Sequence, residues 1–168
     1  IILREEDSSE SEVLNDYLSG SHNPLIVEVE SARGEFSLEA RDGEKKFAAR
    51  VFKIYSPKTH RSRISLVAHR REAVYTSLHN YIPEFSEEFY ENVSNGEEQK
   101  TRNFIVAVYV FGDYLDQNVS IERGGFEFQK ERDLLLGISQ KDIEALAAEY
   151  ARAAVVGEVV DRQDKKSV

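Results

Sequence analysis

The residues from Gly112 to Phe126 form the most unusual segment of the sequence and the part best suited to contact a ligand closely. Asn118 and Ser120 offer short hydrogen-bonding side chains, and Arg123 follows them with a guanidinium group and then two glycines. A guanidinium stays charged at physiological pH and binds two phosphate oxygens at once, and glycines let the backbone approach a ligand closely. The pattern therefore marks Arg123 as a candidate binding residue. The structural alternative is a rigid turn in which Arg123 forms a surface salt bridge.

A second candidate is a basic stretch that contains no acidic residue between Pro57 and Arg71. Its cations could contact a polynucleotide backbone, with Tyr55 and Tyr75 near enough in sequence to stack on bases. The formal charge of −9 for the whole chain opposes such binding, and a solvated loop is the alternative. For His69, at the end of this stretch, we expect a buried imidazole bonded to backbone rather than a catalytic base. The basic residues are Lys58, Arg61, Arg63, Arg70 and Arg71, with His60 and His69 beside them.

Most enzyme and metal-site motifs are missing from the sequence. There is no glycine-rich phosphate loop, no dinucleotide fingerprint and no His-Glu-x-x-His helix, and the four histidines do not share helical spacing. The acidic run from Glu84 to Glu98 lacks calcium-loop spacing. The chain has no cysteine, which fits a reducing compartment such as the cytoplasm, and no apolar run near the roughly 20 residues that span a membrane. We expect no metal site and no self-sufficient enzyme.

Five stretches of the sequence are typical of β-strands. Residues 25–30 are rich in β-branched residues, and residues 36–38 and 47–55 flank the hairpin turn Asp42-Gly43. Residues 64–68 predict a further strand. The unbroken apolar run from Phe104 to Phe111 predicts a central strand that is buried on both faces.

Helices are predicted near both ends of the chain. Ser9 and Glu12 have capping-box spacing, ahead of an apolar stripe that ends at Gly20. Ser139 precedes a second stripe that predicts an amphipathic helix over residues 140–155, with Asp142 in its first turn.

Between the predicted strands, residues 72–85 favour a short helix or turn, because Val74, Leu78 and Tyr81 fit one helical face before Pro83 stops it. Residues 86–100 are acidic and predict a surface helix followed by a loop. These elements predict an α+β fold, with a mixed β-sheet and helices packed mainly on one face. We expect one domain over residues 1–160 and a polar tail over residues 161–168.

Several of these stretches, in this order, resemble part of a known superfamily. They are Val51 to Tyr55, then Ile64-Ser65-Leu66-Val67-Ala68-His69-Arg70-Arg71-Glu72-Ala73-Val74, then Tyr81-Ile82-Pro83, then Tyr114-Leu115-Asp116-Gln117-Asn118-Val119-Ser120-Ile121-Glu122-Arg123. Over roughly residues 25 to 155 the chain is similar to the region that follows the ATP-binding domain in GHKL proteins, the superfamily of histidine kinases, gyrases and heat-shock chaperones.

This resemblance implies a transducer or middle domain with a ribosomal-protein-like fold, in which Arg123 senses the γ-phosphate of ATP and Asn118 and Ser120 shape its loop. The arginine lies one residue further along than in the chaperone pattern. ATP and Mg would be bound mainly by an N-terminal ATP-binding domain of the same protein, because the superfamily's Asp-x-Gly-x-Gly turn and glycine-rich lid are not in this sequence.

Further expectations concern the context of the chain. It begins Ile1-Ile2-Leu3 and contains no methionine, so we expect a piece of a longer ATPase. A homodimer is compatible with the resemblance, nucleic acid is a less favoured partner and a membrane is not expected. The alternative function is a protein-interaction module with no nucleotide role, which would use an exposed sheet edge or the acidic run from Glu84 to Glu98.

Overall fold

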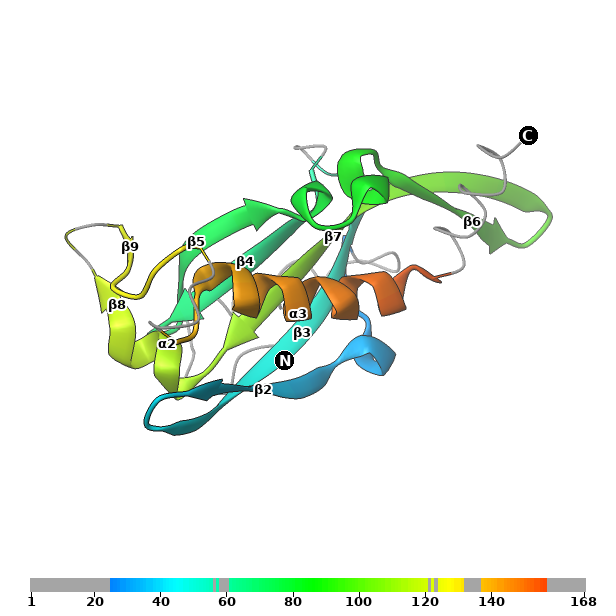
Figure 1. The fold of residues 1–168 in the computed structure, drawn as a ribbon. Coiled ribbons are helices and arrows are strands. Elements are labelled where there is room, and N and C mark those ends of the chain that lie inside the picture. Colours follow the sequence, from blue (N-terminus) through cyan, green and yellow to red (C-terminus); the bar gives the residue numbers. More distant parts are fainter. Residues whose placement is uncertain are drawn as a thin grey trace.

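The structure is a computed structural model that describes residues 25–55, 57, 61–120, 122, 124–131 and 137–156. In these residues the chain is α+β, with short 3₁₀ helices and two α-helices beside a mixed sheet (Figure 1). The elements are β1 Ile26–Glu28, η1 Glu30–Ala32, β2 Gly34–Ala40, β3 Gly43–Tyr55, β4 Arg63–Ala68, β5 Arg71–Ser77, η2 Leu78–Asn80, η3 Pro83–Ser86, β6 Phe89–Asn95, β7 Glu98–Phe111, α2 Asp113–Asn118, β8 Val119–Ser120, β9 Gly125–Phe126 and α3 Gln140–Ala154.

Two long antiparallel strands, β3 and β7, form the centre of the sheet. Their register runs from Ala48 opposite Phe111 to Tyr55 opposite Phe104. Each strand continues beyond this shared part, and the two extensions lie at opposite ends because the strands are antiparallel. The extension of β3 pairs with β2, and the extension of β7 pairs with β6.

The shorter strands line the outer edges of this central pair. β1 and β2 both pair with β3, while β4 and β6 both pair with β7. β4 is parallel to β7, which makes the sheet mixed, and β5 follows as its antiparallel neighbour. A parallel pair needs a long crossover, and here η2, η3 and β6 lie between β4 and β7 in the chain.

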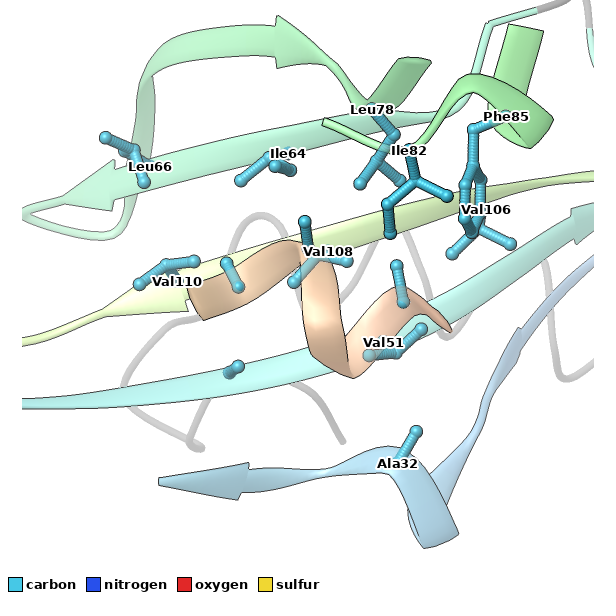
Figure 2. Close-up of a cluster of buried hydrophobic side chains, with 14 of the residues drawn as sticks. Ala32, Val51, Ile64, Leu66, Leu78, Ile82, Phe85, Val106, Val108 and Val110 are labelled. Atoms are coloured by element: carbon cyan, nitrogen blue, oxygen red, sulfur yellow. The ribbon is translucent and has the colours of Figure 1, made fainter. Parts of the chain in front are cut away.

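The main core lies between the sheet and α3. Val51, Val108 and Ile64 form one row across β3, β7 and β4, and all three are fully buried. Figure 2 shows these side chains together with Leu78, Ile82 and Phe85 from η2, η3 and the residues between them. The helix contributes small side chains to the same cluster, namely Ala147, Ala148 and Ala151, beside the larger Ile143 and Val155.

Several predictions from the sequence are confirmed. The hairpin of β2 and β3 turns at Arg41 and Asp42, and Gly43, which pairs with Ala40 at the start of β3, has a φ of +127°. The predicted central strand lies within β7, where Val106 and Val108 are buried toward α3 and Ile105 and Ala107 are buried on the opposite face. Helix α3 begins after Ser139, and Ser139 and Asp142 form a reciprocal capping box.

Two predictions for the middle of the chain are wrong. Residues 71–77 form β5 rather than a helix or turn, because they pair along β4 and only the residues after Ser77 turn into 3₁₀ helices. Residues 89–100 form most of a β-hairpin rather than a surface helix and loop, since β6 pairs with β7 from Phe89 opposite Phe104 to Asn95 opposite Glu98. The predicted helix over residues 9–20 and the tail over residues 161–168 lie outside the described residues.

Gly112 connects β7 to α2 through a tight passage. A side-chain carbon at this position would stand 2.8 Å from the carbonyl oxygen of Lys46 and 3.1 Å from Cδ1 of Phe47. Its φ of 168° is extended backbone that any residue adopts, so the restriction is steric. Only glycine lets β7 pass this close to β3 before the chain turns into α2.

We expect Gly112→Ala to lower the free energy of unfolding by about 1 to 3 kcal/mol, because the added carbon meets backbone that cannot move without disturbing β3. Urea denaturation measures the change. Gly125→Ala is the matched control, since its added carbon would have no neighbour nearer than 3.7 Å, the Cγ2 of Val74. Equal losses in the two variants would contradict the steric role of Gly112.

Candidate functional site

The candidate segment follows β7 and folds into α2 and the small β8–β9 hairpin. The predicted loop is therefore largely regular structure. Asn118 ends α2 and Ser120 ends β8, so the structure describes both. Arg123 lies outside the described residues, between the exposed residues Glu122 and Gly124.

α2 is held on the core by one buried aliphatic residue and a group of aromatic rings. Leu115 is fully buried. The ring of Tyr114 stacks on Phe128 with centroids 5.3 Å apart, and Phe128 stacks on Phe126 at 4.8 Å. Burial, and then the nearby charge of Asp42, raise the pKa of the Tyr114 hydroxyl. These contacts fix where the β8–β9 hairpin leaves the domain.

Asn118 closes α2 and starts the hairpin. Its side-chain nitrogen donates to the carbonyl oxygen of Tyr114 at 2.7 Å, and its own carbonyl oxygen accepts from the backbone N–H of Glu127 at 2.7 Å. Ser120 then pairs with Gly125 across the hairpin. Asn118 therefore links α2 to the start of the β8–β9 hairpin.

The basic turn between β4 and β5 lies beside this segment. The backbone N–H of His69 donates to Oδ1 of Asp116 on α2 at 2.8 Å. The parallel pairing of β4 with β7 explains the contact, because Leu66 is in register with Val110 and both strands end a short distance further on, at the same end of the sheet. The two candidates that the sequence offered separately thus meet in the structure.

The expectation for His69 is wrong. Its side chain is exposed, as are those of Arg70 and Arg71. The reason is that the strand ends at Ala68, so His69 lies in the turn rather than at the end of the buried strand. The turn therefore presents three consecutive basic side chains to solvent.

A further contact joins β5 to the hairpin. β9 lies against β5, where a carbon added to Gly125 would be 3.7 Å from Cγ2 of Val74. α2, β8, β9 and the ends of β4 and β7 gather at one end of the molecule, and the β6–β7 hairpin extends from the other (Figure 1). We refer to the first group, with the turn Ala68–Arg71, as the α2 end.

The earlier part of the basic stretch gives less support to nucleic-acid binding. Tyr55 is only 5% exposed and Arg102 covers its ring at 3.5 Å, so Tyr55 offers no face to a base. Tyr75 is 68% exposed. Arg63 lies 3.7 Å from the carboxylate of Glu72, so its charge has an acidic neighbour. Lys58 and His60 lie outside the described residues.

A second polar cluster surrounds Glu91 where β6 joins the sheet. Its carboxylate lies 3.1 Å from Nε of Arg102 and 3.5 Å from Nζ of Lys53. Burial raises the pKa of Glu91, but hydrogen bonds from Tyr55 and Arg102 and the charge of Lys53 outweigh it and leave this pKa lowered. Burial, together with the bond to Glu91, raises the pKa of Tyr55 to about 12. These groups satisfy one another, so the cluster anchors the hairpin.

A third cluster ties α3 to η2. Glu144 is 2% exposed, accepts a hydrogen bond from the Tyr81 hydroxyl at 2.7 Å and lies 3.3 Å from Nε2 of Gln140. Burial and the carboxylate of Glu144 raise the pKa of Tyr81 well above its usual range. The buried carboxylate is fully engaged by neighbouring side chains, so its contacts are those of a structural tie.

Metal ligands and membrane-spanning helices are both lacking in the part of the chain that is described. No three His, Asp or Glu side chains there are grouped closely enough to hold a metal ion. No helix there is long and apolar enough to cross a bilayer. Comparisons of the chain with protein-family models, curated proteins and solved structures found no match.

Buried Tyr55 and partly buried Tyr81 predict a loss of stability at alkaline pH. A tyrosine whose pKa is raised on folding binds its proton more tightly in the folded state, so its stabilising effect is complete below about pH 10. For Tyr55 this effect is lost as the pH rises through about 12. We expect the free energy of unfolding, measured in urea, to fall between pH 9 and pH 12. The double variant Tyr55→Phe, Tyr81→Phe should be less stable at pH 8 and lose less between pH 9 and pH 12, and equal losses in both proteins would contradict the assignment.

Proposed function

We propose that the chain acts as the transducer or middle domain of a GHKL-type ATPase, beside an ATP-binding domain of the same protein. In this role Arg123 contacts the γ-phosphate of ATP, and Asn118 and Ser120 hold the loop that carries it. The observation that carries the proposal is the α2 end itself, where the hydrogen bond from His69 to Asp116 brings the predicted phosphate-binding segment beside an exposed basic turn.

The position of this segment also supports the proposal. It leaves the carboxyl end of the central strand β7 and lies next to the carboxyl end of the parallel strand β4. Ligands of open sheets that contain parallel strands commonly bind outside such strand ends. An arginine supplied by this chain could be withheld from a bound nucleotide until two domains dock.

The nucleotide itself would be held mainly by the neighbouring domain. The described residues offer no cluster that fits Mg, and one arginine cannot replace a nucleotide pocket. What this chain supplies is positive charge at the transferred phosphate, and in other nucleoside-triphosphate hydrolases an arginine supplied in this way raises the rate by about 10³ to 10⁵. Docking of the α2 end would thus control turnover.

Helix α3 gives a physical route for coupling. The residues after β9 bond directly to its first turn, with the N–H of Gln140 donating to Gln129 and that of Lys141 to Lys130. The same helix lies across β3, β4 and β7. A displacement of the β8–β9 hairpin would therefore reach α3 through backbone hydrogen bonds rather than through flexible side chains.

The test compares ATP hydrolysis by the full-length protein with that of its Arg123→Ala variant. We expect turnover to fall by about 10³-fold or more while ATP affinity stays similar, because the arginine acts on the reacting phosphate and not on nucleotide capture. Arg152→Ala is the matched control, since Arg152 is half-exposed on α3 near Glu149 and should be replaceable without effect. Normal turnover with Arg123→Ala would refute the sensor role.

The chain alone provides a second test by calorimetry. We expect no tight ATP binding and no turnover, because the nucleotide pocket lies in another domain. Tight binding by the chain alone would contradict the transducer proposal. If the full-length protein neither bound nor hydrolysed ATP, a protein-interaction module would be the better account. The observation that favours this second function is the terminal strand β5, which carries the exposed Tyr75.

A further inference from the structure

The turn between β4 and β5 has an unusual backbone. Ala68 pairs with Arg71, so His69 and Arg70 are the two central residues of a hairpin turn, with φ of 50° and 68°. Two-residue hairpin turns with positive φ at both central residues favour Asn-Gly, because most side chains at positive φ clash with the backbone. His-Arg is therefore a conformationally unfavourable choice at both positions. Strain of this kind persists where the surrounding structure enforces it, and it concentrates at functional sites.

The contact that enforces the turn comes from α2. Oδ1 of Asp116 accepts the N–H of His69 at 2.8 Å, across 47 residues of sequence. The carboxylate of Asp116 thus already accepts the backbone N–H of His69, the first of three consecutive exposed basic residues. An Asn-Gly turn could keep the same backbone without strain, but it would present no cation. What the turn gains from Arg70 is positive charge next to the β8–β9 hairpin.

We propose that the turn Ala68–Arg71 is a second contact for the polyphosphate of a nucleotide, and that Asp116 is the positioning residue that holds it. The inference rests on the proposed function, since it assigns a further part of the same phosphate-contacting surface. Arg70 and Arg71, both exposed, supply positive charge from the turn. Asp116 acts through the backbone of His69 and does not itself contact phosphate, which its charge would repel.

The first experiment uses the chain itself, with inorganic tripolyphosphate at low ionic strength as the probe and backbone amide NMR shifts as the readout. We expect the amides of residues 68–71 and of Asp116 to shift. The double variant His69→Asn, Arg70→Gly should raise the melting temperature by about 2 to 4 °C or more, because it removes the strain. It should also weaken tripolyphosphate binding by about 10-fold or more, because it removes the charge.

The control for general loss of charge is Lys141→Gln, Arg152→Gln. Both side chains are half-exposed on α3 and both form surface ion pairs. This variant should change tripolyphosphate affinity by less than about 2-fold, as expected for distant surface charges at an effective dielectric near that of water. An equal loss in the two double variants would overturn the proposal, since binding would then follow net charge alone.

Variants of Asp116 separate its positioning role from a direct one. Asp116→Asn keeps an acceptor for the His69 N–H and removes the negative charge, so binding should be retained or strengthened. Asp116→Ala removes the acceptor and frees the turn, so binding should weaken although a negative charge has been lost. Stronger binding by Asp116→Ala than by Asp116→Asn would overturn the positioning role.

Three remaining outcomes test the ligand class, the link to the proposed function and the inference itself. If a twelve-residue single-stranded oligothymidylate shifted the turn amides and tripolyphosphate did not, the nucleotide assignment would be overturned in favour of a nucleic-acid backbone. If Arg123→Ala left turnover of the full-length protein normal while His69→Asn, Arg70→Gly still weakened tripolyphosphate binding, the turn would be a phosphate site and the transducer role would fail. If tripolyphosphate shifted none of these amides, the inference itself would be wrong.

Discussion

The antiparallel pairing of β3 with β7 is the constraint on which the rest of the structure depends. The two strands share the register from Ala48 opposite Phe111 to Tyr55 opposite Phe104 and then extend past each other in opposite directions. The part of β7 that lies outside this register forms a hairpin with β6. The part of β3 that lies outside it pairs with β2. The pairing also decides where β7 ends, and with it the position of α2 and the β8–β9 hairpin.

Charge is unevenly distributed along the molecule. The α2 end carries the exposed basic turn together with Asp113, Asp116 and Glu122, whereas the β6–β7 hairpin and the residues before it are strongly acidic, with Glu84, Glu87, Glu88, Glu91, Glu97 and Glu98 against Lys100 and Arg102. A net charge of −9 therefore says little about what each end attracts. Interactions between exposed charges fade over about 8 to 10 Å at physiological salt. The charge of the opposite end is too distant to cancel a local attraction for phosphate at the turn.

The elements that sequence reasoning found are those whose evidence is local. The hairpin at Gly43 and the cap at Ser139 each depend on residues within a few positions, and the apolar run of β7 needs no partner to be noticed. β5 was missed because Val74, Leu78 and Tyr81 have helical spacing although the chain changes from strand to 3₁₀ helix between them. The β6–β7 hairpin was missed because its acidic composition outweighed Asn95-Gly96, which is itself a strong hairpin turn signal.

The candidate site could be predicted from the sequence only in part, for a different reason. Arg123, Asn118 and Ser120 could be selected by residue type, as could the basic stretch, but nothing local links the two. Their meeting requires the parallel register of β4 with β7 and the bond between His69 and Asp116. The left-handed backbone of His69 and Arg70 is equally hidden, because neither residue favours it and the contact that supports it comes from α2.

The candidate site could respond to the position of another domain only if the parts of the α2 end are held rigidly together. Gly112 lets α2 approach β3, Leu115 then holds α2 in the core, and Asp116 on α2 holds the turn. Each of these contacts depends on the one before it. α3 is fixed in turn by the bond of Tyr81 to Glu144 and by that of Tyr150 to the backbone of Glu35. A force on the β8–β9 hairpin would thus meet a connected set of hydrogen bonds and packed side chains. Coupling between domains requires such a connected element to have two discrete arrangements.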